Sequence, residues 1–580
     1  MKSARRGFAA ATQPTPRTGD TMKTRLALPL LLFFAHAAHA QFGETVEVRV
    51  TNVEAIVTDR QGKPVTGLTK DDFEVYEDGA RQEITHFEEI ADTRGKAAGS
   101  VPSNATEAAD PRRRLITVLI DLASLEPENR AAVLPQLQNF LTTNMRPGDA
   151  AAIFTWGNSL TVELQPTSDA TAIANAISKV AAYTPKRTDW WRDELQFNIE
   201  SLLYNSDIHR GERAARGEGP EYVQAIAIAR RSAERAVAEM RQKAEAMKSI
   251  LATLRGEQGR KVLVLLTQSL STNPAEEAFY FLSTYRSKFK DGMTLRPAQE
   301  ARKYAMPNLA AEVAAAANSA GVTLYPLHTA GKFTEIGDVE ANKGGTNAGV
   351  FTQPPRLLRE APTFTDPRLL TLSAVSNETG GRAIAGSGNW KGAFDAVSTE
   401  LNTYYSLAYS AQGPREDRIR EIEVRPKNKA YQVRTRRSLV EQTVATAMKD
   451  IVAANLFQPS AMNDLAVTAS VGTATAAGAD LVHPLTVTIP TAKLKLIPDG
   501  TDLVGKLLVF VSFLRADGAV STVGPQVQQF RFPAASLARR KEVTVKLDVT
   551  ADAQVGAMSI GVLDDPSQGT GFAVVKLKGE

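Results

Sequence analysis

The sequence predicts a mixed α/β plus β fold, in which a doubly wound, Rossmann-like α/β domain is flanked by β-sandwich domains. Between residues 115 and 403, apolar segments of strand length alternate with segments of helix length, as in doubly wound sheets. The flanking ranges 41–90 and 464–580 instead show strand and turn patterns. A chain of 580 residues with 43% hydrophobic residues is long enough for roughly three or four domains.

The first forty residues are typical of an export signal. Met22 opens "MKTRLALPLLLFFAHAAHA", in which Lys23 and Arg25 precede an apolar stretch and residues 38–40 form an A-x-A cleavage site. Residues 1–21 contain no apolar core, so we expect Met22 to be the true start. The sequence therefore predicts a protein secreted across the inner membrane, to the periplasm or the exterior.

Composition excludes several classes of protein and site. Removing residues 1–40 takes away six Lys or Arg and one Asp, which changes the formal charge from +4 to −1 and removes the electrostatic support for a nucleic-acid partner. The absence of cysteine excludes disulfides and thiolate metal sites. No later stretch approaches the ~20 unbroken apolar residues of a membrane helix, so no transmembrane segment is expected.

The range 41–90 is predicted to be a small β unit. "VEVRVTNVEAIVTD" places Val46, Val48 and Val50 on one face of a strand, and Asp78-Gly79 indicates a hairpin. Residues 91–114 are small, polar and unpatterned, which indicates a linker.

The range 115–403 contains the elements of the α/β domain. Strands are predicted at 115–121, 151–156, 160–164, 261–267 and 322–327, and helices at 127–144, 168–182, 189–204, 299–320 and 366–379. Two of the strands, 115–121 and 261–267, are apolar on both faces, as central parallel strands are.

A long helix is predicted over residues 221–255. Its apolar side chains recur at alternating spacings of three and four residues, the pattern of a coiled-coil-like seam: Ala233, Val237, Met240, Ala244, Met247, Leu251 and Leu254. Either the last turns cover the sheet while the rest of the helix is solvated, or the helix projects and contacts a partner.

The remaining ranges are mostly strand. Residues 404–440 form a β meander that we expect to pair with the 41–90 unit, because each set alone has too few strands to bury a core. A helix and linker follow at 441–463. Strand and turn signals over 464–580, such as the alternation in "KEVTVKLDV", predict an immunoglobulin-like β-sandwich.

Several segments together carry a resemblance to a known family. "VTDRQGKPVTGLTKDDFEVYEDGARQEITHF" at 57–87, "GRKVLVLLT" at 259–267, "SNETGGRAI" at 376–384 and "YYSLAYS" at 404–410 resemble von Willebrand factor A (VWFA)-related proteins of the acidobacterial type. The resemblance implies a parallel six-stranded sheet with helices on both sides, a fold used for protein binding. It also implies a metal-ion-dependent adhesion site: D-x-S-x-S after the first strand, a later Thr, and an Asp after the fourth strand, holding Mg²⁺.

This sequence departs from the implied metal-site pattern. Asp121 matches the first Asp, but Ala123 and Leu125 stand where the two serines belong, and Gln268 stands where the later Asp belongs. We expect these three side chains to converge on Asp121 in a partly apolar pocket, with Leu125 pointing inward. The site is therefore predicted to be degenerate and to hold no metal or other cofactor, with Asp121 as the one weak candidate ligand.

Other hydroxyl groups could substitute in part. Thr184 or Thr188 could match the loop Thr, whereas Ser124 stands at the wrong offset and is expected to point away from its neighbours. Asp121 itself is more typical of a residue that caps the following helix or accepts hydrogen bonds from loop amides.

Two further features border the same edge of the predicted sheet. Trp190 and Trp191 are candidates for a binding hot spot, with core packing as the alternative. Residues 330–364 form a long loop rich in Gly, Thr, Asn and Pro, which is typical of either a functional or an unstructured segment.

The leading functional hypothesis is a secreted, non-enzymatic protein that binds another protein through the loop edge of the α/β sheet. The first alternative is a Mg²⁺-dependent adhesin with a residual site at Asp121. The second is an envelope hydrolase using carboxylates such as Asp71 and Asp72, for which a solvated turn is the simpler interpretation. No catalytic constellation is recognised in the sequence, and its partner remains unidentified.

Overall fold

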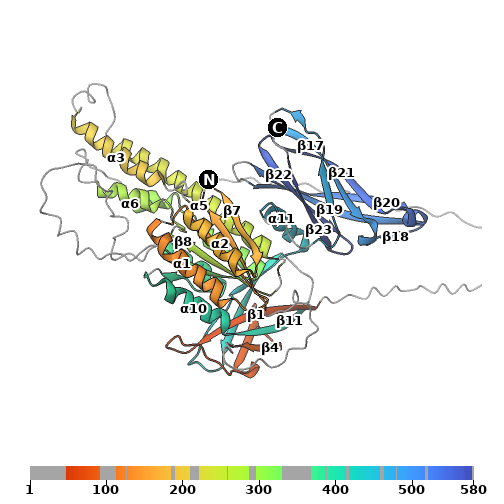
Figure 1. The fold of residues 1–580 in the computed structure, drawn as a ribbon, viewed down its shortest axis with the longest axis horizontal. Helices are drawn as coiled ribbons and strands as arrows, with labels where there is room; N and C mark the ends of the chain where they lie inside the picture. The colour runs from red at the N-terminus through yellow and green to blue at the C-terminus, as the bar shows by residue number, and fades with distance from the viewer. Residues whose placement is uncertain are drawn as a thin grey trace, which may run out of the picture. The chain divides into compact units, whose positions relative to one another are not determined.

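A computed structural model describes residues 48–91, 113–125, 127–157, 159–183, 190–208, 221–255, 257, 259–268, 270–285, 296–329, 367–385, 388–412, 417–457, 463–478, 480–515 and 520–577 (Figure 1). The predicted signal region 1–40, most of the predicted linker 91–114 and the loop 330–364 lie outside the described residues. The chain is a mixed α/β protein with several sheets.

The central sheet has six strands in the order β10-β9-β8-β5-β6-β7. Their bounds are β5 Arg114–Asp121, β6 Ala150–Trp156, β7 Leu160–Thr167, β8 Arg260–Thr267, β9 Val322–His328 and β10 Ile384–Ala385. In sequence order this is 3-2-1-4-5-6 read from the β7 edge, the strand order of a doubly wound sheet. One strand departs from the all-parallel sheet that the resemblance implied: β7 is antiparallel to β6. Only three residues separate the two strands, which suffices for a hairpin but not for a crossover.

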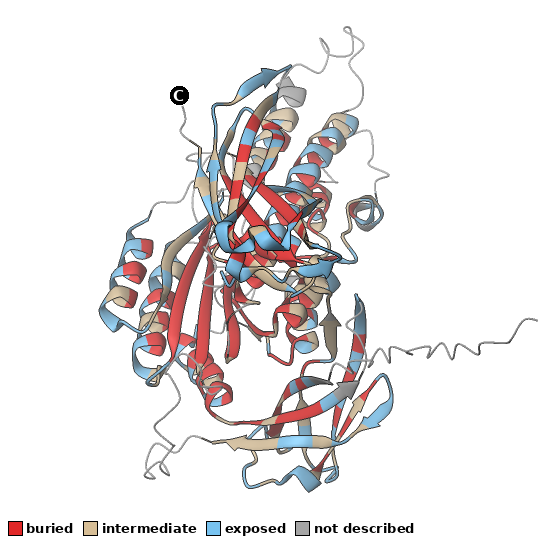
Figure 2. Cartoon of the chain, turned by 90° about the vertical axis from the view of Figure 1, so that its right-hand side faces the viewer, coloured by how far each residue is buried: buried red, intermediate tan, exposed pale blue. Residues whose placement is uncertain are grey.

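Helices cover both faces of this sheet, and the strands β5, β6, β8 and β9 are buried along their whole length (Figure 2). One face packs against α1 Pro127–Asn144, α2 Ala170–Ala182 and α10 Trp390–Asn402. The other packs against α5 Glu221–Leu254, α8 Leu309–Ala320 and α9 Pro367–Glu378. Successive side chains of β5 alternate between the two cores: Ile116 and Val118 enter the first, and Leu115 and Leu119 the second.

One predicted helix is divided in the structure. The range 299–320 contains α7 Pro297–Arg302 and α8, with turns between them. Pro307 lies in this interruption, immediately before the N-cap Asn308. Proline disfavours helical geometry at the residue before it and has no N–H to donate, so a continuous helix was the wrong prediction here.

The predicted seam of the long helix is used within the chain. The first half of α5 packs through Ala225, Ala229 and Ala233 against α3 Trp190–Ile208 and α6 Glu276–Thr284. The second half packs against the central sheet through residues such as Met240 and Met247. The seam is therefore covered by the chain's own elements. It is neither a solvated face nor a surface left open for a partner.

Strands from both ends of the α/β segment form two four-stranded sheets with a common core. Their orders are β13-β1-β11-β4 and β14-β12-β2-β3. The bounds are β1 Val48–Thr58, β2 Phe73–Glu77, β3 Ala80–Gln82, β4 Ile84–Ile90, β11 Tyr404–Gln412, β12 Arg418–Pro426, β13 Gln432–Arg434 and β14 Ser438–Glu441. β1 pairs with β11 and β2 with β12, so strands that are more than 300 residues apart lie side by side.

The C-terminal range also contains two sheets that share a core. One includes β15 Thr468–Val471, β16 Thr475–Ala477, β17 Asp480–Pro490 and β21 Glu542–Asp552; the other includes β18 Ile497–Asp499, β19 Asp502–Arg515, β20 Val520–Pro533, β22 Val555–Asp564 and β23 Gly569–Lys576. Helix α11 Val444–Ala454 packs on β19 and β22. In the described part of the chain, no helix combines the length and the apolar character needed to cross a membrane.

Candidate functional site

Asp121 is the last residue of β5, a central strand of the parallel part of the sheet, and is 1% exposed. The six apolar or β-branched residues before it are all buried, which fixes the strand between two layers of helices. Its carboxylate therefore emerges at the carboxyl edge of the sheet, the edge where ligands bind in this class of fold.

A hydroxyl from the loop after β5 and a hydroxyl from the last residue of β8 donate to this carboxylate. Asp121 Oδ2 accepts hydrogen bonds from Ser124 Oγ at 2.6 Å and from Thr267 Oγ1 at 2.6 Å. The Ser124 amide donates to Oδ1 at 3.3 Å, so a loop amide is also a partner. The expectation that Ser124 points away is wrong, because the chain after β5 turns back and the amides of Ser124 and Leu125 both donate to the Asp121 carbonyl.

The counter-charge of Asp121 is a lysine from the long helix. Lys243 Nζ lies 2.7 Å from Asp121 Oδ2, and the two side chains are 2% and 1% exposed. A second carboxylate, Glu239 Oε1, lies 3.9 Å from the same ammonium group. We call the set Asp121, Ser124, Lys243 and Thr267 the carboxyl-edge site.

Lys243 is not among the site residues predicted from the sequence, although its position on α5 is a signal for it. Lys243 follows Met240 by three residues and precedes Met247 by four, so it lies on the face of α5 that enters the core. A lysine on such a face must find a buried partner, since an unpaired buried charge is costly.

The three residues that replace the expected metal ligands do not converge on Asp121. Ala123 and Leu125 are each 3% exposed, but Ala123 joins the core beneath α5 and Leu125 joins the core beneath α1, on the opposite face of the sheet. Gln268 donates through Nε2 to the Thr329 carbonyl at 3.1 Å. Leu125 is thus buried, but it fills a core and does not cover the carboxylate.

The other predicted site residues cannot be placed at the carboxyl-edge site. Thr184 and Thr188 lie outside the described residues. Trp190 and Trp191 form the start of α3, and their side chains lie outside the described part of the structure.

The carboxyl-edge site does not fit the metal ion that the resemblance implies. Mg²⁺ needs a near-octahedral shell of oxygens. Here the Ser124 and Thr267 hydroxyls donate to Asp121, and an ammonium group occupies the space 2.7 Å from Oδ2. Two cations cannot share that oxygen without strong repulsion. Among the described residues, no group of three or more His, Asp or Glu side chains could hold a metal ion.

The carboxylates considered for hydrolysis lie in a turn. Lys70–Asp72 is a short 3-10 helix, and Asp72 Oδ2 accepts hydrogen bonds from the Thr69 amide at 2.8 Å and the Thr69 hydroxyl at 2.9 Å. These bonds lower the pKa of Asp72, led by the backbone bond from Thr69. Asp71 is exposed. Both residues therefore have the features of a capped, solvated turn.

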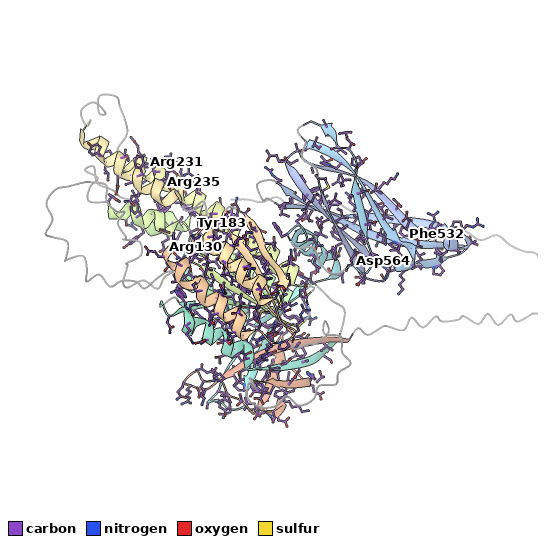
Figure 3. The ribbon with its side chains drawn as sticks, in the orientation of Figure 1. Arg130, Tyr183, Arg231, Arg235, Phe532 and Asp564 are labelled. Atoms are coloured by element: carbon purple, nitrogen blue, oxygen red, sulfur yellow. The ribbon has the colours of Figure 1, made fainter. Side chains whose placement is uncertain are left out.

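Exposed and half-buried side chains lie at the same edge of the sheet as the carboxyl-edge site. Tyr183, at the end of α2, is 52% exposed, and its carbonyl accepts a hydrogen bond from Arg130 in α1 at 2.6 Å (Figure 3). Leu370 in α9 is 57% exposed. The adjacent Thr371 hydroxyl accepts from the amide of Thr272, which follows β8, so this part of α9 lies at the same edge. We call Arg130, Tyr183 and Leu370 the edge rim.

No family model matches the chain, and no curated protein matches it. Among solved structures, an aerotolerance-related membrane protein from Bacteroides fragilis is similar over 50% of this chain and 98% of its own, with 12% identity and a TM-score of 0.24. BatB from Bacteroides thetaiotaomicron is similar over 50% and 97%, with 10% identity and a TM-score of 0.23.

A manganese-loaded TRAP protein from Plasmodium vivax is similar over 60% of this chain and 96% of its own, with 11% identity and a TM-score of 0.20. At such identities and TM-scores, these likenesses carry no weight for function. The fold class rests on the strand order of the central sheet and the helices on its two faces.

Proposed function

We propose that this chain is an exported, non-enzymatic binding protein with a von Willebrand factor A-like domain, which engages another protein through the edge rim without a metal ion. The observation that carries the proposal is the buried pair of Asp121 and Lys243. The charge of Asp121 is already balanced by Lys243, and its Oδ2 atom also accepts hydrogen bonds from two hydroxyls, so this oxygen is not available to coordinate a cation. Recognition at this edge then depends on exposed side chains.

The edge rim has the chemistry of a protein contact. Tyr and Arg are enriched among the residues that dominate binding energy at protein interfaces, and Tyr183 and Arg130 are already held together by a hydrogen bond. Leu370 adds an exposed apolar group at the same edge. The bond to the Tyr183 carbonyl orients the Arg130 side chain, which lowers the entropic cost of binding through that residue.

The two alternatives have less support in the geometry. A metal-dependent adhesin needs an open cation position, which Lys243 fills. A hydrolase using Asp71 and Asp72 needs a carboxylate directed at a substrate, whereas Asp72 caps its own turn.

The test is affinity capture by the mature chain, beginning at residue 41, from the periplasm and culture medium of its native host. We expect a protein partner that is retained equally in Mg²⁺ and in EDTA. The double substitution Tyr183→Ala and Leu370→Ser should reduce capture at least about tenfold, as expected when interface anchors are lost. The matched control is Ile419→Ser, because Ile419 is 62% exposed and lies in β12, away from the rim.

Capture that disappears in EDTA would contradict the metal-free part of the proposal. Capture that is unaffected by the rim substitutions would contradict the binding surface. A failure to recover any protein partner would count against the binding function itself.

A further inference from the structure

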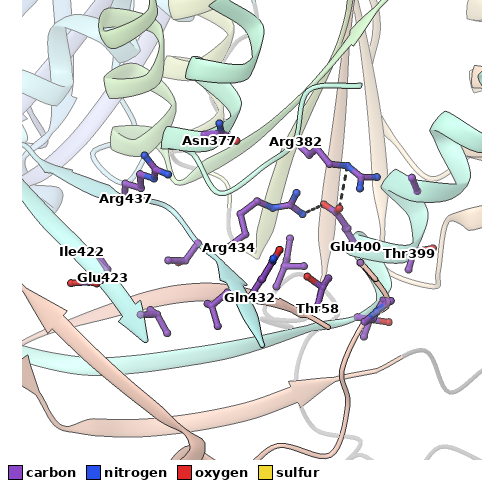
Figure 4. A pocket seen from close by; sticks show the side chains of 18 residues that line it. Thr58, Asn377, Arg382, Thr399, Glu400, Ile422, Glu423, Gln432, Arg434 and Arg437 are labelled. Carbon is purple, nitrogen blue, oxygen red and sulfur yellow. Dashed lines mark ion pairs between the residues drawn. The ribbon is translucent and has the colours of Figure 1, made fainter. Parts of the chain in front are cut away.

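A second polar site lies at the opposite, amino edge of the central sheet. A cavity of about 810 Å³ opens where β1, β12 and β13 face α9 and α10 (Figure 4). Its charged lining includes Arg382, Glu400, Arg434 and Arg437, and we call this cavity the junction cleft. Its volume is within the usual range of small-molecule sites.

Three arginines line the junction cleft, and their charges are only partly compensated. Glu400 is 7% exposed and pairs with Arg434 at 2.5 Å and with Arg382 at 3.5 Å. One carboxylate thus faces two guanidinium groups. The third, Arg437, is 66% exposed and reaches Glu378 at 3.7 Å, at the limit of an ion pair.

The other acidic residue of the lining does not correct this imbalance. Glu423 accepts two hydrogen bonds from Arg425, at 2.7 and 2.6 Å. Arg425 is outside the lining of the cleft. The negative charge of Glu423 is therefore balanced by Arg425 and does not offset the arginines of the lining.

Further cations lie behind the wall of the cleft. Arg260 is buried and pairs with Glu54 at 2.9 Å. Arg436 and Lys261 are each 8% exposed, and the hydrogen bonds recorded for their side chains among the described residues go to the carbonyls of Gly321 and Arg255. Burial, together with the charge of Arg436, lowers the pKa of Lys261 to about 8. This region therefore holds more positive than negative charge.

The cleft also contains polar atoms whose hydrogen bonds are not made within the described chain. Arg434 Nε and Thr435 Oγ1 are both buried and have no hydrogen-bond partner among the described residues. A buried donor without a partner costs about 1–3 kcal/mol, so a ligand that supplies the missing acceptor gains affinity.

We propose that the junction cleft binds a small organic anion that carries carboxylate groups. Arginine presents a planar fork of donors that matches a carboxylate. The ion pairs of Arg382 and Arg434 with Glu400 show that two of these arginines bind a carboxylate. Asn377, Gln432 and Thr58 line the same cavity and offer neutral hydrogen bonds. Ile422 and Val424 supply an apolar wall for a carbon skeleton. This site is independent of the function proposed above.

Calorimetric titration of the mature chain tests the site with three probes: citrate, succinate and inorganic phosphate, at constant ionic strength. We expect saturable binding of citrate with a dissociation constant of about 1 mM or tighter, and weaker binding of succinate. Arg437→Gln should weaken citrate binding at least about tenfold, because an exposed arginine that faces the cavity is lost. Arg425→Gln is the matched control, since the Arg425 side chain is also exposed, at 53%, and lies outside the lining.

Arg437→Gln should leave the thermal unfolding of the ligand-free chain nearly unchanged, since its side chain is exposed. If it unfolds the protein, Asn377→Ala provides a second variant, because Asn377 is exposed and lines the cavity. The absence of saturable binding by any probe would overturn the proposal, as would an equal loss of binding in Arg425→Gln. Phosphate binding tighter than citrate would overturn the assignment to carboxylates.

Discussion

The carboxyl-edge site and the junction cleft lie at opposite edges of one sheet and treat buried charge in opposite ways. At the carboxyl edge, Asp121 meets Lys243 at 2.7 Å, and two hydroxyls donate to the same carboxylate oxygen. At the junction, Glu400 is shared between Arg382 and Arg434, and a cavity remains beside them. The first site is closed by its own side chains, and the second is open.

The difference shows that the balance between positive and negative side chains, more than their number, decides whether a buried polar site is available to a ligand. Two opposite charges in contact, with their hydrogen bonds made, leave no group for a ligand to satisfy. An excess of one sign together with unmade hydrogen bonds leaves both a field and an unsatisfied donor.

The largest expected effect on stability comes from removing Lys243 from the carboxyl-edge site. Lys243→Met leaves Asp121 buried without its counter-charge and should lower the free energy of unfolding by about 3–5 kcal/mol. Urea unfolding followed by circular dichroism measures it. The control is Lys248→Met, on the same helix with a side chain 29% exposed, which should cost less than about 1 kcal/mol.

A second substitution distinguishes charge from packing at this site. Adding Asp121→Asn to Lys243→Met removes the unpaired charge, so it should recover part of the lost stability. Equal stability of Lys243→Met and the unmodified chain would contradict the view that this pair closes the site.

A smaller effect on stability is expected when a negative charge near the junction cleft is removed. Glu54→Gln removes the carboxylate 2.9 Å from Arg260, and Glu54 is 19% exposed. We expect a loss of about 2 kcal/mol in the free energy of unfolding, below the full cost for a completely buried pair. Glu423→Gln, in an exposed pair with Arg425, serves as the control and should have little effect. A loss of stability no greater than in the control would show that the excess positive charge near the junction cleft does not destabilise the folded chain.

The pH dependence of stability should also report on the junction. The folded pKa of Lys261, about 8, lies below its ordinary value of 10.5, so the unfolded chain binds more protons between these values. The free energy of unfolding should therefore rise with pH in that window, by roughly 1 kcal/mol per pH unit.

The comparison that isolates this effect is Lys261→Met, which should lose the slope between pH 8 and about 9.5. The window stops there because burial raises the pKa of Tyr325 and Tyr409, which reverses the sign at higher pH. An identical slope in both proteins would assign the pH dependence to other groups.

The smallest effect on stability is expected when divalent cations are added, because the carboxyl-edge site leaves them no position. Millimolar Mg²⁺ or Mn²⁺ should shift the melting temperature of the unmodified chain by less than about 1 °C, since binding to the folded state is what would raise it. Restoring oxygen ligands by Ala123→Ser and Gln268→Asp should create affinity only when Lys243→Ala is added, because the ammonium otherwise repels the metal. A strong metal effect on the unmodified chain, lost in Asp121→Ala, would contradict the closed site.

Local sequence patterns determined much of the secondary structure. The apolar runs that end at Asp121 and Thr267 are strands buried along their whole length, and the helix predicted at 127–144 has the bounds of α1. These features follow from side-chain spacing over a few turns or residues. Where a local signal was read incompletely, as at Pro307, the helix prediction failed.

The sequence by itself also determined that hydroxyls are absent at Ala123 and Leu125. Only the tertiary structure decided what replaces their role. Lys243 is 122 residues from Asp121 and meets it because α5 packs across the sheet. At the junction, Glu400 and Arg434 come from α10 and β13, and the strands joining that region pair across more than 300 residues. No local periodicity specifies which distant charges will meet, because the partner of a buried charge depends on how whole elements pack.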